Sequence, residues 1–196
     1  MAIDAKHVYI GTPEQSSTVG ALSRGTALTT IPATYDAAAT AIASFTKAGY
    51  ISEDGATLNI DKSTTDIIEW ARNKVRRVME GVDATIGCTI IQLDEDDAKL
   101  VFGDDNVTAT AASTTHGKQL KIAVGAEMDT AHAWALRIKD GDFKMIVLVP
   151  NGQVTSGIDM TFAADQAISM PVTISGNDDG NGKTVYIYTD DGQKTS

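Results

Sequence analysis

The stretch VMEGVDATIGCTI at residues 78–90 decides the fold class. Its even-numbered residues are apolar, interrupted only by Glu80, whereas most of its odd-numbered residues are small or polar, among them Gly81 and Asp83. A period of two is typical of a β-strand with one buried face and one wetted face. The sequence therefore predicts a long strand over about residues 75–92.

Similar alternation and regular turn signals indicate that most of the chain is built from strands. Alternation recurs over residues 154–162 and 166–175, and Asp140-Gly141 is a strong hairpin signal between two apolar runs. Pro171 cannot donate to a ladder, so its strand is expected at an edge or a bulge. Further strands are expected at residues 7–10, 27–31, 107–110, 119–124, 132–139, 143–149 and 184–189, the last forming a pair with 166–175 around residues 177–182. The prediction is one mainly β domain over residues 1–196, a sandwich or half-barrel.

One short helix is predicted at residues 94–102. Asp94 is a suitable N-cap, and Glu95, Asp96 and Asp97 place negative charge in the first turn, where it offsets the helix dipole. Gly103 follows as the residue that ends the helix.

Residues 32–74 form the least regular part of the chain. They carry many apolar residues without a sustained period, apart from an Ala-rich turn of helix over residues 37–43. We interpret this part as a long structured loop, and loops of this length in compact domains are usually functional. Tyr50 and Trp70 are the expected anchors of a contact with a partner.

The charge balance argues against a site that holds nucleic acid. The 196 residues include 16 Lys and Arg against 26 Asp and Glu, a net charge of −10. Phosphate contacts need clustered cations, although a surface that nucleic acid passes without binding remains compatible with this charge. Cys88 is expected to be a buried thiol. The first ten residues lack a secretory pattern, and no apolar run is long enough for membrane insertion.

No motif predicts a catalytic centre, a cofactor or a metal site. Residues 177–184, NDDGNGKT, resemble both a P-loop and a calcium loop, but the first glycine of the one and the final Glu of the other are missing. A hairpin tip is the favoured interpretation. His7, His116 and His132 are isolated from other ligating residues, and no serine has a nucleophile-elbow pattern. We therefore expect the protein to have no enzymatic activity.

The basic residues Arg72, Lys74 and Arg76 form the one cationic cluster and would share a face in a regular strand. Two interpretations remain open. The cluster is either a solvated strand entry or a contact with an acidic stretch of another subunit, such as residues 94–97 or 104–105.

Several segments, taken in order, give the chain a family resemblance. They are AGYISEDG at 48–55, residues 58–61, residues 66–77 with Trp70, the strand 78–93 with the helix 95–102, the exit GDDN at 103–106, and MPVTI at 170–174. This chain resembles the major tail tube proteins of long-tailed (siphovirus-type) bacteriophages. The resemblance implies a β-sandwich whose hexameric rings stack into a tube, with one sheet lining a lumen that carries DNA. It also implies that the loop 32–74 bridges stacked rings. Because the apolar residues of this loop lack a period, we expect it to be mobile before assembly.

The resemblance further implies a virion protein made in the bacterial host cytoplasm. Its partners would be further copies of itself and the tape measure, tail-tip and tail terminator proteins, while DNA passes without specific binding. Residues 190–196 read as a polar tail, with no extra immunoglobulin-like domain. Asp83 and Asp159, on polar strand faces, are candidates for the lumen wall. The alternatives are a type VI secretion-like tube protein and a carbohydrate- or receptor-binding β-sandwich. The second is weakened by low aromatic content, four Phe, two Trp and five Tyr.

Overall fold

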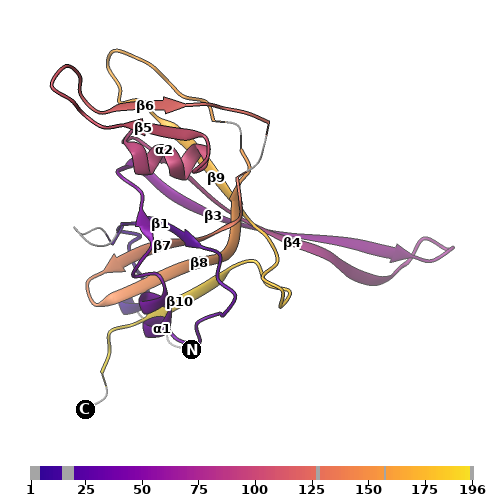
Figure 1. Cartoon of the computed structure of the whole chain (residues 1–196). Coiled ribbons are helices and arrows are strands. Elements are labelled where there is room, and N and C mark those ends of the chain that lie inside the picture. Colours follow the sequence, from indigo (N-terminus) through magenta and orange to yellow (C-terminus); the bar gives the residue numbers. More distant parts are fainter. Residues whose placement is uncertain (1–4, 15–19, 127–128, 157, 195–196) are drawn as a thin grey trace.

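The computed structural model describes residues 5–14, 20–126, 129–156 and 158–194, which form a β-rich body from which one long hairpin projects (Figure 1). The helices of this described part are α1 (Tyr35–Ala41) and α2 (Glu95–Phe102), and a 3-10 turn covers Ala5–His7. The strands are β1 (Leu22–Thr26), β2 (Thr46–Lys47), β3 (Ile51–Ile68), β4 (Lys74–Ile90), β5 (Val107–Thr110), β6 (Gln119–Ile122), β7 (His132–Asp140), β8 (Phe143–Val154), β9 (Met170–Gly176) and β10 (Tyr186–Asp190). The predicted mainly β fold class is confirmed.

A single antiparallel path connects almost all of the strands. It runs β2-β1-β7-β8-β9-β4-β3, while β10 joins β8, and β5 and β6 form a separate hairpin. The first part of β8 pairs with β10 at residues 144–148, and its last part pairs with β9 at residues 152–154. Because one strand serves both halves, the sheet curves around its core as a half-barrel.

The main core lies inside this curve. Ala84, Ile86, Cys88 and Ile90 are buried, so the alternation in β4 is confirmed for the part of the strand that lies in the body. The side chains packed with them come from β1, β7, β8, β9 and α2, and include Leu22, Trp134, Val149, Met170, Ile174 and Leu100. Burial raises the pKa of the Cys88 thiol to about 11, which keeps it protonated as an inert core residue.

A second, smaller core corrects our interpretation of residues 32–74 as a loop. The Ala-rich segment forms α1, whose Ala38 packs with Ile42 against Ala135, Ile146 and Leu148. Thr34 caps this helix through the Ala37 N–H at 3.3 Å. The rest of the segment contains β2 and the whole of β3, an 18-residue strand. Residues up to Leu58 thus belong to the domain's own cores, because Ala48, Ile51, Ala56 and Leu58 pack in the main one, and only the part of β3 beyond them projects with β4.

The locally encoded elements fold as predicted. Asp94 caps α2 by accepting the Asp97 N–H at 2.9 Å, and Gly103 ends the helix with φ of 91°. Gly141, at φ 59°, turns the chain between β7 and β8. Both structures depend on residues within a few positions of one another.

Several predicted strands are wrong or displaced. β8 ends at Val154 and β9 begins at Met170, and the described residues between them form only an isolated bridge from Thr161 to Ser169. The early strand is β1 at residues 22–26 instead of 27–31, and residues 8–10 lie outside any strand. β9 and β10 do not pair with each other, since β9 pairs with β4 and β8 while β10 pairs with β8. The C-terminal tail lies in part outside the described residues.

Asp97 is the most unusual ionisable group of the body. It is fully buried, and its Oδ1 accepts the Gly49 N–H at 2.6 Å, while the described residues offer its Oδ2 no hydrogen-bond partner. Loss of hydration on burial raises its pKa to about 6. Because the folded state binds this proton more tightly than the unfolded state does, the contribution is stabilising at low pH and is lost as the pH rises through about 6.

We therefore expect Asp97→Asn to remove a pH dependence of folding between about pH 3.8 and 6, the ordinary and the raised pKa of this carboxyl group. A shift from the ordinary Asp value of 3.8 to about 6 corresponds to at most about 3 kcal/mol. Urea unfolding of both proteins across this window is the measurement. The pKa values of Asp66 and Glu95 are lowered to about 2 by their basic partners, so their contribution to stability is lost as the pH falls from about 4.5 to 2; both proteins share it, and it cancels in the comparison. Parallel pH profiles for the two proteins would contradict the assignment to Asp97.

Within the described ranges, neither helix is long and apolar enough to cross a membrane.

Candidate functional site, the projecting arm

The most distinctive feature of the molecule is the outer part of the β3–β4 hairpin, residues 60–82, which we call the arm (Figure 1). Within the body, β4 pairs with β9 from Thr85 to Ile90 on the side opposite β3. Beyond that point the two strands have only each other among the described residues, and the hairpin leaves the body as a two-stranded ribbon. Such ribbons are marginally stable in isolation, and their outer edges are open to other strands.

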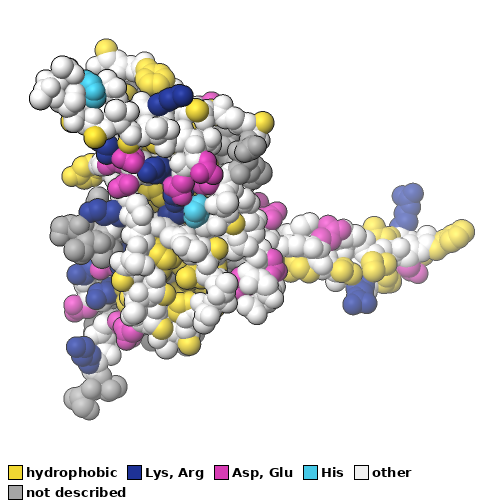
Figure 2. Space-filling view, in the orientation of Figure 1, with side chains coloured by type: hydrophobic (Ala, Val, Ile, Leu, Met, Phe, Trp, Pro, Cys, Tyr) yellow, Lys and Arg dark blue, Asp and Glu magenta, His cyan; other side chains and the backbone are white. Residues whose placement is uncertain are grey.

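The arm exposes apolar side chains along its length, as the yellow atoms of Figure 2 show. Val78 and Val82 continue the alternation that predicted a buried face, but they are exposed because no second layer reaches them. The exposed large apolar side chains of this part are Ile60, Ile67, Ile68, Trp70, Val75, Val78, Met79 and Val82. A cluster of this kind on a soluble protein marks a contact surface.

Polar pairs across the ribbon hold the arm in shape. Asp66 accepts from Arg77 Nε at 2.8 Å and also forms an ion pair with Lys74. The hydrogen bond from Arg77, followed by that from Lys74, lowers the pKa of Asp66 to about 2, so the carboxylate stays charged at neutral pH. Because these groups are exposed to water, we assign them a role in local shape and little folding energy.

A second set of polar contacts occupies a bulge in the middle of the arm. Ser63 pairs with Gly81 and Thr64 with Met79, which leaves Glu80 as the extra residue of β4. The Glu80 carboxylate accepts from Ser63 Oγ at 3.0 Å and from Thr65 Oγ1. The hydrogen bond from Thr65 lowers the pKa of Glu80 the most, and that from Ser63 lowers it further. Side-chain hydrogen bonds across the two strands therefore stabilise the bulge.

The tip of the arm presents an aromatic ring and a strained residue. Trp70 is 102% exposed, the full exposure of a free side chain. Arg72 has φ of 66°, the left-handed region in which Gly or Asn is usual, and this costs of the order of 1 kcal/mol. The Arg72 N–H donates to Glu69 O at 2.9 Å, and the Glu69 N–H donates to Asn73 O at 3.0 Å. The tip turn thus holds Arg72 in a strained backbone conformation two residues from the exposed Trp70.

The structure brings together four of the five predicted interface residues, with one correction. Trp70 and Arg72 lie in the tip turn, and Lys74 and Arg76 begin β4. A bulge at Val75 places Lys74 opposite Ile68 but Arg76 opposite Ile67. Because neighbouring strand residues point to opposite faces, the prediction that the three basic residues share a face is wrong.

Tyr50, the fifth predicted residue, lies elsewhere. It precedes β3 at the end far from the tip, is 64% exposed, and its carbonyl accepts the Ile91 N–H at 2.9 Å. It therefore belongs to the body, one length of β3 away from Trp70, and its role as an anchor of a partner contact stays a prediction.

The two lumen candidates fall on different surfaces. Asp83 lies at the root of the arm, directly opposite Asp61, where two like charges face each other across the strands. It is in register with the polar outer face of β3, β4 and β9, which carries Asn59, Thr85 and Ser175. Asp159 is exposed in the connection between β8 and β9 and is not on a strand.

The other motifs of the sequence have structural roles. Asp178 Oδ1 accepts the Gly180 N–H at 2.6 Å, and Asp179 Oδ1 accepts the Asn181 N–H at 2.8 Å. These carboxylates close the turn upon themselves, as expected of a hairpin tip. In the described part of the chain, no group of three His, Cys, Asp or Glu side chains has the geometry to hold a metal ion.

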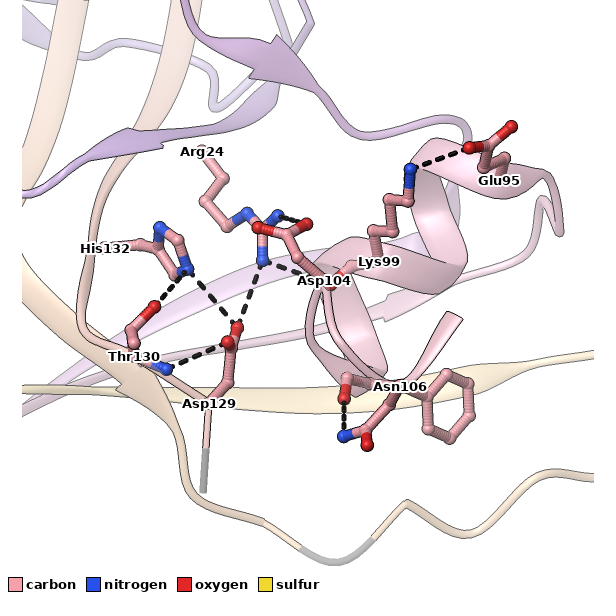
Figure 3. A network of polar contacts seen from close by, with 9 residues as sticks. Arg24, Glu95, Lys99, Asp104, Asn106, Asp129, Thr130 and His132 are labelled. Carbon is pink, nitrogen blue, oxygen red and sulfur yellow. Dashed lines mark hydrogen bonds and ion pairs between the residues drawn. The ribbon is translucent and has the colours of Figure 1, made fainter. Parts of the chain in front are cut away.

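The sequence did not predict a network of polar contacts around the buried Arg24 (Figure 3). Arg24, 7% exposed, donates to Asp104 at 2.5 Å, to Asp129 at 3.2 Å and to the Lys99 carbonyl at 3.1 Å. Asp129 also lies 3.3 Å from His132 Nε2, so the predicted structural role of His132 is supported. The network ties α2 and the residues after it to β1 and β7, and no local pattern connects residues so far apart in sequence.

We expect Arg24→Ala to destabilise the body by about 1–3 kcal/mol, because it leaves the partly buried Asp129 and the Lys99 carbonyl without their donor, whereas the half-exposed Asp104 is hydrated instead. Urea unfolding would measure this loss, with Arg76→Ala in the exposed arm as the matched control that changes stability by less than about 0.5 kcal/mol. Equal effects of the two substitutions would contradict a structural role of the network.

Comparison with known proteins identifies the family. The family model described as phage tail tube protein matches residues 16–196. Among solved structures, a chain of the virion of a native gene transfer agent particle is 14% identical with a TM-score of 0.41, covering 74% of this chain and 88% of that chain. A chain of the tail of an empty gene transfer agent particle, computed with C6 symmetry, is 17% identical with a TM-score of 0.38, covering 67% and 80%. No curated protein sequence matches. The chain therefore belongs to the phage tail tube protein family, and it is a structural component of the virion tail instead of an enzyme.

Proposed function

We propose that this protein forms hexameric rings that stack into a tail tube, and that phage DNA passes through this tube during ejection. The observation that carries the proposal is the arm, a two-stranded ribbon whose exposed apolar side chains the monomer leaves uncovered. Burial of such surface is the main driving force of protein association. A subunit that extends its own strands beyond its body is suited to reach a neighbouring copy.

Open sheet edges support closure into a ring. In the described residues, β3 ends the strand path with β4 as its only partner, and the other end is β2, which has two residues. Exposed edges favour pairing with another chain, and a head-to-tail contact that closes on rotation gives a ring. A second contact along the axis, made by the arm, would then give a filament of rings. The inter-ring role expected for residues 32–74 is accordingly proposed for residues 60–82.

The outer face of β3, β4 and β9 is our candidate for the lumen wall. Its paired rows are Asp61-Asp83, Asn59-Thr85-Ser175 and Thr57-Gly87-Thr173. These rows contain hydroxyl, amide and carboxylate groups but no Lys or Arg. A wall of this kind has no cation to bind phosphate, and its carboxylates repel it. DNA can therefore move along the wall without the binding that counterion release would drive.

Electron microscopy of the purified protein, alone and with tail-tip components, tests the assembly. Rings with sixfold symmetry and tubes are expected. A protein that remains monomeric at millimolar concentration with tail-tip components present would overturn the proposal. Tubes would also separate this function from a carbohydrate-binding module, while the family match favours a phage tail over a type VI secretion tube.

The DNA path has a separate test. The variant Thr85→Lys/Ser175→Lys should assemble into tubes that retain DNA at low salt and release it at high salt, because each new cation adds a phosphate contact. A filter or sedimentation assay with short duplex DNA measures this. Thr108→Lys/Thr110→Lys in β5, outside this face, is the matched control and should leave DNA unbound. Equal DNA binding by both variants would show that the outer face of β3, β4 and β9 does not line the lumen.

A further inference from the structure

An apolar groove lies at the end of β3 that is far from the tip of the arm. It has a volume of about 320 Å³ and runs between the start of β3, the end of β7 and the N-terminal segment. Its apolar lining comes from Pro13, Ala21, Ile51, Ala56, Leu136 and Ile138. We call it the β7 groove.

The β7 groove is built to receive an apolar group. Arg137, the cation of its lining, is buried and has Glu14 Oε2 at 3.2 Å from its Nε; the two are not aligned for a hydrogen bond, so they form a neutral ion pair. Neither group is therefore a free charge for a ligand. Glu53 lines the groove, and the exposed Asp54, between the lining residues Glu53 and Gly55 in the chain, adds a second negative charge next to it. The groove thus combines an apolar interior with an acidic rim.

The tip of the arm has the complementary chemistry. Trp70 is fully exposed, and an indole removes about 150–250 Å² of surface from water when it is enclosed, which favours its burial in an apolar groove. Residues 66–77 carry four Lys and Arg against two Asp and Glu, whereas the whole chain has a net charge of −10. A basic tip with an aromatic centre matches an apolar groove with an acidic rim in both polarity and charge.

The geometry excludes docking within one copy. Ala56 lies beside the groove and Trp70 at the tip, and at about 3.3 Å per residue β3 separates them by about 45 Å. The donor and the acceptor therefore stand at opposite ends of the same strand. A contact between such different surfaces joins copies head to tail and continues from one copy to the next.

We propose that Trp70 of one copy inserts into the β7 groove of the next copy, with Arg72 of the tip facing Glu53 and Asp54 on the rim. This inference rests on the proposed assembly into tubes, for which it specifies the receiving site. It explains why the fold keeps Arg72 in a strained conformation next to an uncovered tryptophan. It also gives the groove an occupant made of this same chain.

Tryptophan fluorescence gives the first test, because the chain has two tryptophans and Trp134 is only 2% exposed. In the monomer, acrylamide should quench Trp70 emission, obtained as the difference between wild type and Trp70→Phe. On assembly this emission should shift to shorter wavelength and its quenching constant should fall at least fivefold. If tubes form while Trp70 stays quenchable, the docking is wrong and the tube assignment stands. If no assembly forms under any condition, both are overturned.

Blocking the groove gives the second test. A Cβ at Gly11 meets no atom within 4 Å, so Gly11→Phe can place a ring over the groove without a clash. Gly117→Phe, in the turn between β5 and β6, is the matched control, since Gly117 is equally open. Gly11→Phe should raise the protein concentration needed for tubes at least tenfold and leave circular dichroism unchanged, while Gly117→Phe should assemble as wild type. Equal assembly by both variants would overturn the docking.

Cross-linking tests the pairing of the two surfaces directly. The double variant Ala71→Cys/Gly11→Cys should give a ladder of linked copies after oxidation of tubes, whereas each single variant should give none. The native Cys88 is buried and stays out of the reaction. Absence of a ladder from well-formed tubes would overturn the docking.

Discussion

Shortening the arm is expected to abolish tube formation while the body remains folded. We would replace residues 62–82 by Asn-Gly, which joins Asp61 and Asp83, two residues that already face each other. The removed part is exposed along most of its length and contributes no side chain to either core cluster. The free energy of unfolding should therefore change by less than about 1 kcal/mol, whereas the contact that we assign to the arm is lost entirely.

Electron microscopy beside circular dichroism decides this prediction. A variant with intact body spectra and no tubes or stacked rings is the expected result, and Ala71→Ser in the full-length tip is the control that should assemble normally. Normal tubes from the shortened protein would show that the arm is dispensable. An unfolded body would show instead that the arm is part of the folding unit.

Charge reversal at the tip is expected to give the second largest effect. With Arg72, Lys74 and Arg76 all changed to Glu, the tip would repel an acidic neighbour, and tubes should fail to form at any practical concentration. The individual exposed pairs contribute only about 0.2–1 kcal/mol each, but every subunit repeats them. Salt should weaken assembly of the wild type for the same reason, since exposed charges are screened beyond about 8 Å at physiological ionic strength.

The structure improves the design of this experiment. Lys74 forms an ion pair with Asp66 within the arm, so Lys74→Glu would also place two carboxylates side by side. The double variant Arg72→Glu/Arg76→Glu avoids this disturbance and should still raise the protein concentration needed for tubes more than tenfold. For a matched pair, Arg76→Glu is compared with Lys121→Glu in β6, which has the same change in net charge. Equal assembly of these two variants would show that the basic cluster is a solvated strand entry and does not contact another subunit.

Local sequence determined the elements whose causes lie within a few residues. The alternation of β4 predicted its buried face from Ala84 to Ile90, and the acidic first turn with Asp94 and Gly103 predicted α2. Asp140-Gly141 predicted the turn between β7 and β8. Each of these signals acts through a neighbouring backbone group or through the side-chain period of a strand.

In the arm, the local sequence pattern does not predict which side chains are buried. β3 carries apolar residues without a clear period because most of its outer length has water on both faces, so no single face selects them. Val78 and Val82 keep the apolar period of β4, yet they are exposed because β9 stops pairing at Thr85. The bulge at Val75 reverses the faces of Lys74 and Arg76, and it depends on how two strands are aligned.

The sequence by itself determined the mainly β class, the helix α2 and the family resemblance, and it singled out Trp70, Arg72, Lys74 and Arg76 as a predicted interface. Only the tertiary structure decided that this group stands at the tip of a free ribbon, that Arg24 joins Asp104 and Asp129, and that the β7 groove lies at the other end of β3. The reason is physical. Propensity, capping and turn geometry act over a few residues, whereas burial, strand register and the shape of a groove depend on which distant segments meet.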